Sequence, residues 1–226
     1  MIPNEINYIY GLPAYITKIN PKLYEKNKIL SQIEKNYKVA KVRNEWGLNS
    51  FFKTDIHPSL QDEKNPKFKT INYYSLPPQY DKIIADFFKK LCLQDKRFQI
   101  SKMIVNYSCV RHNSVMTPHI HTGCTFSLIH YISFDKKQHL PTIFKSPYYF
   151  YQLLPYQDNL IAVFANREEN SWIYKEWALD TEEDDIIIVP AILEHGVRNL
   201  DSKKSRITIA VNIRINDEKS KKKSYS

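Results

Sequence analysis

The sequence predicts a mainly β protein: a jelly-roll barrel with helices packed outside one of its sheets. Three observations predict this class. From Phe98 onward, the chain consists of short, β-branched, often alternating apolar runs separated by turn residues. Before that point, two stretches carry apolar residues at helical spacing. The sequence shows neither an internal repeat nor strands alternating with crossover helices, which argues against a parallel α/β sheet.

The N-terminal part is expected to hold one strand and two helices. Residues 14–19 (AYITKI) have the composition of a short strand. Asn20 and Pro21 then supply a helix cap and a proline suited to the first helical turn, so we expect a helix over about 21–36. A second helix is expected over 78–92, where apolar residues form one stripe after two prolines.

The C-terminal part is expected to form the barrel. In its last strand, alternation places Arg206, Thr208, Ala210 and Asn212 on one face and aliphatic residues on the other. If the polar face points into the barrel, Arg206 needs an anionic partner, because an unpaired buried guanidinium is costly. The strand-like runs are FQISKMIVNYSCV (98–110), TFSLIHYISF (125–134), NLIAVFA (159–165), DDIIIVPA (184–191) and SRITIAVNIRI (205–215).

We expect a single domain over residues 1–216, because 226 residues suffice for one substantial core. Its helical part is placed at about 1–95 and its jelly-roll core at about 98–215. The basic tail 217–226 is expected to be disordered. The long aromatic segment 139–177 is expected to be a loop, which either borders the barrel mouth as a lid or recognition wall, or packs against the outer sheet.

Composition limits the classes of function. The net charge of +9 can favour nucleic acid or an anionic small substrate, but a solvated lysine-rich surface is the favoured interpretation. The three cysteines are far apart and form no CxxC pair, so neither a disulfide framework nor a zinc ribbon is indicated. No leader-like segment and no run of 18 apolar residues occurs, so we expect a soluble cytoplasmic protein without a membrane partner.

Three histidines are candidates for a metal site. His119 and His121 are two residues apart, so in a strand they point to the same face. His195 ends another buried strand-like run, and Arg206 follows it closely. Neutral imidazoles bind Fe, Zn, Cu and Ni well, and three protein ligands leave coordination positions open. The other histidines are interpreted as hydrogen-bonded structural residues: His57, His112, His130 and His139.

The order of these residues resembles the Fe(II)- and 2-oxoglutarate-dependent dioxygenases. Their pattern is His-x-Asp/Glu, a distal His, and an Arg shortly beyond it. Here it corresponds to His119-Ile120-His121, His195 and Arg206-Ile207-Thr208. The stretches PHIHTGCTFSLIHY and IIIVPAILEHGVRNLDSKKSRITIAVNI are similar to a bacterial and phage branch of the family. The resemblance covers about residues 98–215, over half of the chain.

The resemblance implies a double-stranded β-helix with a metal in the barrel mouth. It implies Fe(II), 2-oxoglutarate and O₂ as cofactors, ascorbate as a stimulant, and the cytoplasm of a bacterium or of a phage-infected host. By position, the metal ligands would be His119, His121 and His195; the cosubstrate would contact Arg206, Thr208 and Tyr131; and Asn212 and Ser127 would orient the site from behind.

One departure concerns the second motif position, where the family's carboxylate is replaced by His121. In one arrangement, three neutral histidines hold the metal. In the other, His121 is the first ligand, the carboxylate slot falls on Gly123, and the metal has two protein ligands. We favour the three-histidine arrangement, because His119 and His121 share a face. Gly123 and Gly196 can provide a tight turn or a close backbone approach beside the ligands.

Three functions are compatible with these observations. The first is an oxygenase that hydroxylates an unidentified small-molecule or macromolecular substrate and releases succinate and CO₂. The second is a cupin-like metalloenzyme that does not use 2-oxoglutarate and whose Arg206 binds the carboxylate of its own substrate. The third is a non-catalytic jelly-roll module that binds nucleic acid or glycan. The sequence favours the first, and it does not identify the substrate.

Overall fold

The computed structural model describes most of the chain: residues 3–39, 53–54, 75–91, 98–110, 114–147, 175–200, 202 and 204–217. Several predicted features lie outside these ranges, namely the strand 159–165, most of the aromatic segment 139–177, the tail beyond Asp217, and the histidines His57 and His112.

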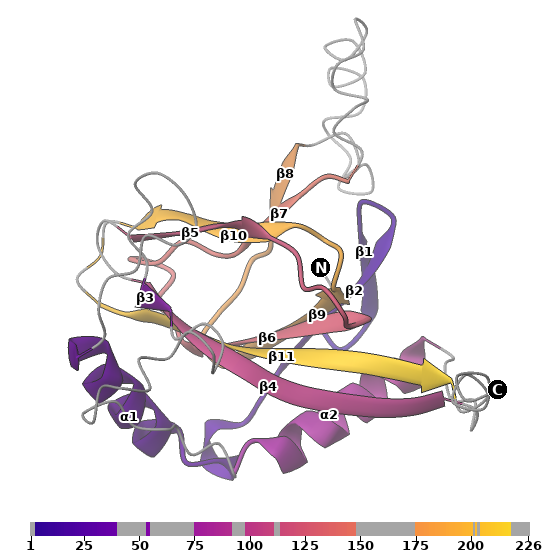
Figure 1. Ribbon diagram of the computed structural model, residues 1–226, viewed down its shortest axis with the longest axis horizontal. Helices are drawn as coiled ribbons and strands as arrows, with labels where there is room; N and C mark the ends of the chain where they lie inside the picture. Colours follow the sequence, from indigo (N-terminus) through magenta and orange to yellow (C-terminus); the bar gives the residue numbers. More distant parts are fainter. Residues whose placement is uncertain are drawn as a thin grey trace, which may run out of the picture.

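Two antiparallel sheets face each other and enclose the barrel (Figure 1). The larger sheet has the strand order β1-β2-β9-β6-β11-β4-β3, and the smaller sheet has the order β5-β10-β7-β8. The mainly β jelly-roll fold is therefore confirmed. The strands are β1 (Ile6–Ile9), β2 (Leu12–Lys18), β3 (Lys53–Thr54), β4 (Phe98–Val110), β5 (Ser114–His119), β6 (Phe126–Ser133), β7 (Ile143–Lys145), β8 (Glu176–Ala178), β9 (Asp185–Pro190), β10 (His195–Leu200) and β11 (Arg206–Asp217).

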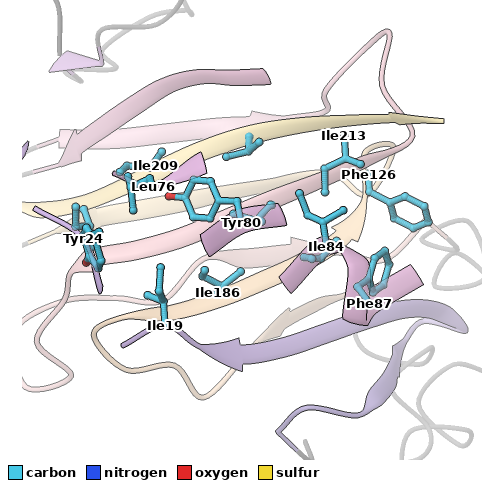
Figure 2. Packing of buried hydrophobic residues seen from close by; sticks show 14 of the residues in the cluster. Ile19, Tyr24, Leu76, Tyr80, Ile84, Phe87, Phe126, Ile186, Ile209 and Ile213 are labelled. Carbon is cyan, nitrogen blue, oxygen red and sulfur yellow. The ribbon is translucent and has the colours of Figure 1, made fainter. Parts of the chain in front are cut away.

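The two helices cover the outer face of the larger sheet, below it in Figure 1. They are α1 (Lys26–Val39) and α2 (Pro77–Lys90). In α2, the buried residues Tyr80, Ile84 and Phe87 recur at helical spacing and pack against the aliphatic side chains of the sheet (Figure 2). Burying one such large side chain stabilises the fold by about 1.5–3 kcal/mol. Within the described residues, no helix is long and apolar enough to cross a membrane.

Strand β11 lies between two hydrophobic cores, because its side chains point alternately to the two faces of the larger sheet. Its aliphatic residues, from Ile207 to Ile213, belong to the outer core that contacts the helices. Arg206 and Thr208 are buried on the opposite face, inside the barrel, so the polar face that the alternation predicts points inward. A second hydrophobic cluster fills the barrel interior and joins both sheets: Ile9, Tyr10, Ala14, Ile16, Ile129, Tyr131, Phe134, Phe144, Leu179, Ile187, Val189 and Leu193.

The first predicted helix is interrupted after one turn. Asn20 caps a short 3₁₀ helix (Pro21–Leu23) by accepting a hydrogen bond from the Lys22 N–H. Tyr24 then adopts an extended backbone, with φ −149° and ψ 164°, before α1 begins. This conformation accompanies a buried hydrogen bond from the Tyr24 hydroxyl to Asp184, a contact that local spacing cannot predict.

Two regions contain more strand than the sequence predicts. The predicted strand 14–19 corresponds to β2, and the N-terminal part also supplies β1 and β3 to the larger sheet, which the sequence does not predict. The segment 139–177, expected to be a loop, begins with β7 and ends with β8, which pair with each other. Trp177, in β8, packs against the interior cluster. Strands of three residues are too short to show a recognisable alternation.

A cluster of polar side chains joins the helices to the turn before β9. Asp184 accepts hydrogen bonds from the Tyr24 hydroxyl at 2.8 Å and from the Lys26 ammonium at 2.8 Å. His130 Nε2 lies 3.9 Å from the same carboxylate, and His130 Nδ1 lies 2.9 Å from the Tyr80 hydroxyl. Burial alone would raise the pKa of Asp184, but His130, Lys26 and Tyr24 outweigh burial and lower it from 3.8 to about 2.

Replacing Asp184 by asparagine is expected to destabilise the fold. Because the folded-state pKa is the lower one, the ionised carboxylate contributes stability above about pH 4, and this contribution is lost as the pH falls through about 2. The shift corresponds to about 2 kcal/mol at neutral pH. We expect a melting temperature about 4–8 °C lower. Thermal unfolding of both proteins between pH 2 and pH 7 measures this.

A matched control is Asp180→Asn, because the Asp180 side chain is 89% exposed and pairs with an exposed lysine. Such surface pairs contribute little, so its melting temperature should match that of the wild type. A constant difference between wild type and Asp184→Asn down to pH 2 would contradict the role of the ionised carboxylate.

Candidate metal centre

The three candidate histidines converge between the ends of β5 and β10. His119 is the last residue of β5 and His195 the first of β10, and they are direct partners in the antiparallel register. His121 follows two residues after β5, where its backbone N–H donates to the Ala191 carbonyl at 2.9 Å. One ligand nitrogen from each ring lies within 4.8 Å of the other two. Residues separated by 76 positions in the chain therefore form one potential metal site.

Hydrogen bonds fix each imidazole in the same tautomer. Nδ1 of His119 faces the Thr117 carbonyl at 2.9 Å, and Nδ1 of His195 faces the Leu193 carbonyl at 2.8 Å. Nδ1 of His121 faces the Asn212 side-chain oxygen at 2.8 Å. Each acceptor requires a proton on Nδ1, so Nε2 is the nitrogen of each ring that carries the lone pair a metal would bind. Metal-ligating histidines are commonly oriented by such contacts.

Burial keeps the three imidazoles neutral. The pKa of His195 is lowered to about 3, mainly by burial and further by the neighbouring histidines and Arg206. Burial also lowers the pKa of His119 and of His121, against the opposing effect of their hydrogen bonds. Neutral imidazole is the form that binds metals, so the site is suited to a cation at neutral pH.

Arg206 lies fully buried inside the barrel without a carboxylate partner among the described residues. Its Nε donates to the Leu140 carbonyl at 2.9 Å, and its Nη2 donates to the Thr142 hydroxyl at 2.8 Å. Its Nη1 has no hydrogen-bond partner there. Burial lowers the pKa of the guanidinium, and Tyr131 beside it acts in the opposite direction. A buried cation with a free donor is a site for an anionic ligand.

Thr142 was missed by the sequence analysis, although it connects Arg206 to Tyr131. Its Oγ1 accepts one hydrogen bond from Arg206 and another from the Tyr131 hydroxyl at 2.7 Å. Since both lone pairs are engaged, the hydroxyl proton of Thr142 remains available for donation. The only sequence signal is its position in PTIF, within the segment expected to be a loop.

Further polar groups line the same interior face. Thr208 is buried, and Ser108 lies directly opposite it in the β4–β11 register. Ser127 lies opposite Asn212 in the β6–β11 register. Directly opposed residues of an antiparallel pair share a face. The buried hydroxyls of Ser108 and Ser127 have no hydrogen-bond partner within the described residues. Together with Arg206 Nη1, they leave an unsatisfied polar surface that fits a bound polar ligand.

The two candidate glycines have different roles. Gly123 adopts φ +76° in the turn after His121, and its carbonyl accepts hydrogen bonds from Arg214. A side chain on Gly196 would come within 2.6 Å of the Met116 carbonyl, so Gly196 permits close approach of β5 and β10. His119, and not Gly123, accompanies the other two histidines, which favours the three-histidine arrangement.

Two other histidines are held outside this centre. His130 lies in the Asp184 cluster, on the helix side of the larger sheet. His139 accepts a hydrogen bond from the Asp135 N–H at 3.0 Å, and its Nε2 faces the Lys204 carbonyl at 3.3 Å. His139 thereby supports the turn that leads to Leu140, whose carbonyl contacts Arg206.

Comparisons with known proteins agree with this geometry. A family described as "Putative 2OG-Fe(II) oxygenase" matches residues 107–212, which include all three histidines and Arg206. No protein of curated function matches the chain. Among solved structures, a prolyl hydroxylase from Trichoplax adhaerens, in complex with a hypoxia-inducible factor peptide fragment, is similar with a TM-score of 0.51 and 14% identity. The alignment covers 94% of this chain and 87% of that one, and it supports the fold.

A second solved structure, HygX from Streptomyces hygroscopicus with nickel and 2-oxoglutarate bound, aligns with a TM-score of 0.43 and 11% identity, over 90% of this chain and 83% of that one. The family match lies on the strands that carry the histidines and Arg206, and the jelly-roll fold agrees with it. The family match and the fold together therefore support membership of the 2-oxoglutarate- and Fe(II)-dependent oxygenases, which are oxidoreductases.

Proposed function

We propose that this chain is a dioxygenase that binds Fe(II) through His119, His121 and His195 and uses 2-oxoglutarate and O₂ to hydroxylate a C–H bond of its substrate. Succinate and CO₂ would be released. The family match supports the cofactors, and the convergence of the three histidines supports the metal ligands.

The observation that carries the proposal is the unsatisfied donor of Arg206 beside the histidines. Its charge is close enough to contribute to the lowered pKa of His195. A dicarboxylic acid that binds a metal at one end must place its far carboxylate on a cation within the barrel. Arg206 offers the required charge and a free N–H there, and Thr142 offers a hydroxyl proton.

The chain's own residues would position the reactants. The three Nε2 atoms would hold the metal, while Arg206, Thr142 and Tyr131 would orient the cosubstrate. When bound, Fe(II) would supply the activation of O₂: one oxygen atom enters succinate as CO₂ leaves 2-oxoglutarate, and the other enters the substrate. The interior cluster around Phe144 and Leu193 would exclude bulk water from one side of the site.

The direct test uses wild-type protein with Fe(II) and 2-oxoglutarate in air. We expect slow conversion of 2-oxoglutarate into an equal amount of succinate even without substrate, and stimulation by ascorbate. Succinate and remaining 2-oxoglutarate are measured by chromatography, with samples lacking Fe(II) as the control. Binding of metal without any succinate would contradict the proposal and favour a cupin-like enzyme whose Arg206 holds a substrate carboxylate.

A further inference from the structure

We infer that Arg214 is a positioning residue for the metal ligand His121, which it controls by holding the turn that carries this histidine. The inference rests on the proposed metal centre, and it assigns a role to a residue outside the family's ligand pattern. Arg214 is exposed and lies at the far end of β11.

His121 is the one candidate ligand that no strand pairing holds. Strand β5 ends at His119, and residues 120–125 form the turn that leads to β6. His119 and His195, in contrast, are registered against each other by the β5–β10 ladder. Apart from the bond between its own N–H and the Ala191 carbonyl, the position of the His121 ring therefore depends on contacts made by its turn.

Arg214 makes a two-pronged contact with that turn. Its Nε donates to the Gly123 carbonyl at 2.9 Å, and its Nη2 donates to the same oxygen at 2.6 Å. Gly123 reaches the required backbone geometry through its positive φ of +76°. The Cys124 thiol completes the turn by donating to the His121 carbonyl at 3.5 Å. The carbonyl two residues after the ligand is thus fixed to β11.

The same strand also fixes the ring of His121. Asn212 and Arg214 are two residues apart on β11, so both side chains project from the same face of the strand. Asn212 contacts Nδ1 of the imidazole, while Arg214 holds the turn. The backbone of β11 adds the bond from the Thr125 N–H to the Ile213 carbonyl at 2.8 Å. Arg206 is the first residue of the same strand. Strand β11 therefore helps to fix the positions of both His121 and the guanidinium that would bind an anion.

Because Arg214 is exposed, its removal should affect the position of His121 more than the stability of the fold. Within the described residues, no carboxylate forms an ion pair with it. An exposed hydrogen bond of this kind adds little to global stability. The expected consequence of its removal is a displaced His121, and so a weaker and altered metal site in a protein that remains folded. Losing residues that orient metal ligands typically lowers metal affinity about 10–100-fold.

The experiment titrates Co(II), whose visible absorption reports the ligand geometry, into the wild type, Arg214→Ala and Arg214→Lys. Arg198→Ala is the matched control, because Arg198, in β10, is also exposed but pairs with Glu176 of β8. We expect about a 10-fold loss of Co(II) affinity and changed absorption bands in Arg214→Ala. Arg214→Lys should recover part of the affinity, because an ammonium can reach the carbonyl but cannot reproduce the fork. Arg198→Ala should match the wild type.

A double-mutant cycle tests whether the effect passes through His121. Adding Arg214→Ala to His121→Ala should cause no further loss of affinity for Ni(II), which imidazole sites bind more tightly than Co(II). Adding it to His119→Ala should still cause about the same loss as in the wild type. Each background lacks one histidine ligand. Because only His121 lies on the turn that Arg214 holds, a difference between the two backgrounds shows that Arg214 acts through His121.

Several results would overturn the inference. Wild-type Co(II) affinity and spectrum in Arg214→Ala would exclude a positioning role, and so would an equal loss in the His121→Ala background. A large drop in the melting temperature of the metal-free Arg214→Ala and Arg214→Lys proteins would assign Arg214 to folding. A wild-type protein that binds no metal would contradict the proposed function itself, an outcome distinct from the others.

Discussion

Replacing His195 by asparagine is expected to abolish succinate formation while the barrel stays folded. The Asn amide N–H can occupy the place of imidazole Nδ1 and keep the bond to the Leu193 carbonyl, which His195 makes at 2.8 Å. It has no atom at the place of Nε2. Because a lost ligand should matter more than a lost orienting contact, we expect metal affinity to fall at least about 100-fold.

His195→Gln is the complementary variant. Its amide reaches the place of Nε2 but loses the bond to Leu193, so it should retain weak metal binding. Metal affinity is measured by anaerobic Fe(II) titration, turnover by succinate release, and folding by the melting temperature of the metal-free proteins. Wild-type turnover in His195→Asn would remove His195 from the metal ligands. Unfolding of both variants would instead assign the buried ring, 3% exposed, to the core.

The sequence was most informative where the chemistry follows the period of one strand. Arg206 and Thr208 alternate with aliphatic residues in β11, and this alternation alone predicts that one face is polar and the other is apolar. The spacing of His119 and His121 likewise predicts a shared direction. The position of the distant His195 beside them does not follow from local spacing, because its pairing with β5 is a tertiary contact.

The parts that could not be predicted depend on pairing between distant segments. Thr142 reaches Arg206 because β7 joins the smaller sheet beside β10, and a three-residue strand carries no periodic signal. Ser108 enters the interior through the β4–β11 register. Tyr24 breaks the first helix in favour of a contact with Asp184, 160 residues away. In each case, tertiary contacts override or extend the local pattern.

The replacement of a carboxylate by His121 changes the charge at the proposed centre. Three neutral imidazoles leave the full +2 charge of Fe(II) uncompensated by the protein, whereas a carboxylate ligand would cancel one unit. The buried Arg206 adds another positive charge inside the barrel. A dianionic cosubstrate matches this arrangement, because it brings one carboxylate to each cation. The strength of cosubstrate binding should therefore depend heavily on Arg206.

Replacing Arg206 by alanine is expected to weaken 2-oxoglutarate binding strongly while Fe(II) binding persists. Arg206 would pair its free Nη1 with the far carboxylate in a fully buried setting. Truncating one partner of such a desolvated pair costs about 2–5 kcal/mol. This corresponds to a loss of affinity of roughly 30-fold to several thousand-fold. The three histidines are held by other groups, so the metal site should remain.

Further variants distinguish how the charge, the planar shape and the volume of the Arg206 side chain contribute to 2-oxoglutarate affinity. Arg206→Lys should recover only part of the affinity, because an ammonium cannot reproduce the planar fork that spans Leu140 and Thr142. Arg206→Met fills most of the space without charge, so it should bind 2-oxoglutarate as weakly as alanine but fold better. Thr142→Val removes one hydroxyl and keeps the cation, and it should cause a smaller loss, about 10-fold.

The measurement is a titration of 2-oxoglutarate into anaerobic Fe(II) protein, followed by the metal-to-ligand charge-transfer absorption that the family resemblance leads us to expect. Arg198→Ala serves as the control for loss of a cation, because Arg198 is exposed and pairs with Glu176. Wild-type affinity in Arg206→Ala would refute the assignment of Arg206 to the cosubstrate. Loss of Fe(II) together with 2-oxoglutarate in Arg206→Met as well as Arg206→Ala would show that the buried guanidinium maintains the barrel, and the far carboxylate would then need another partner.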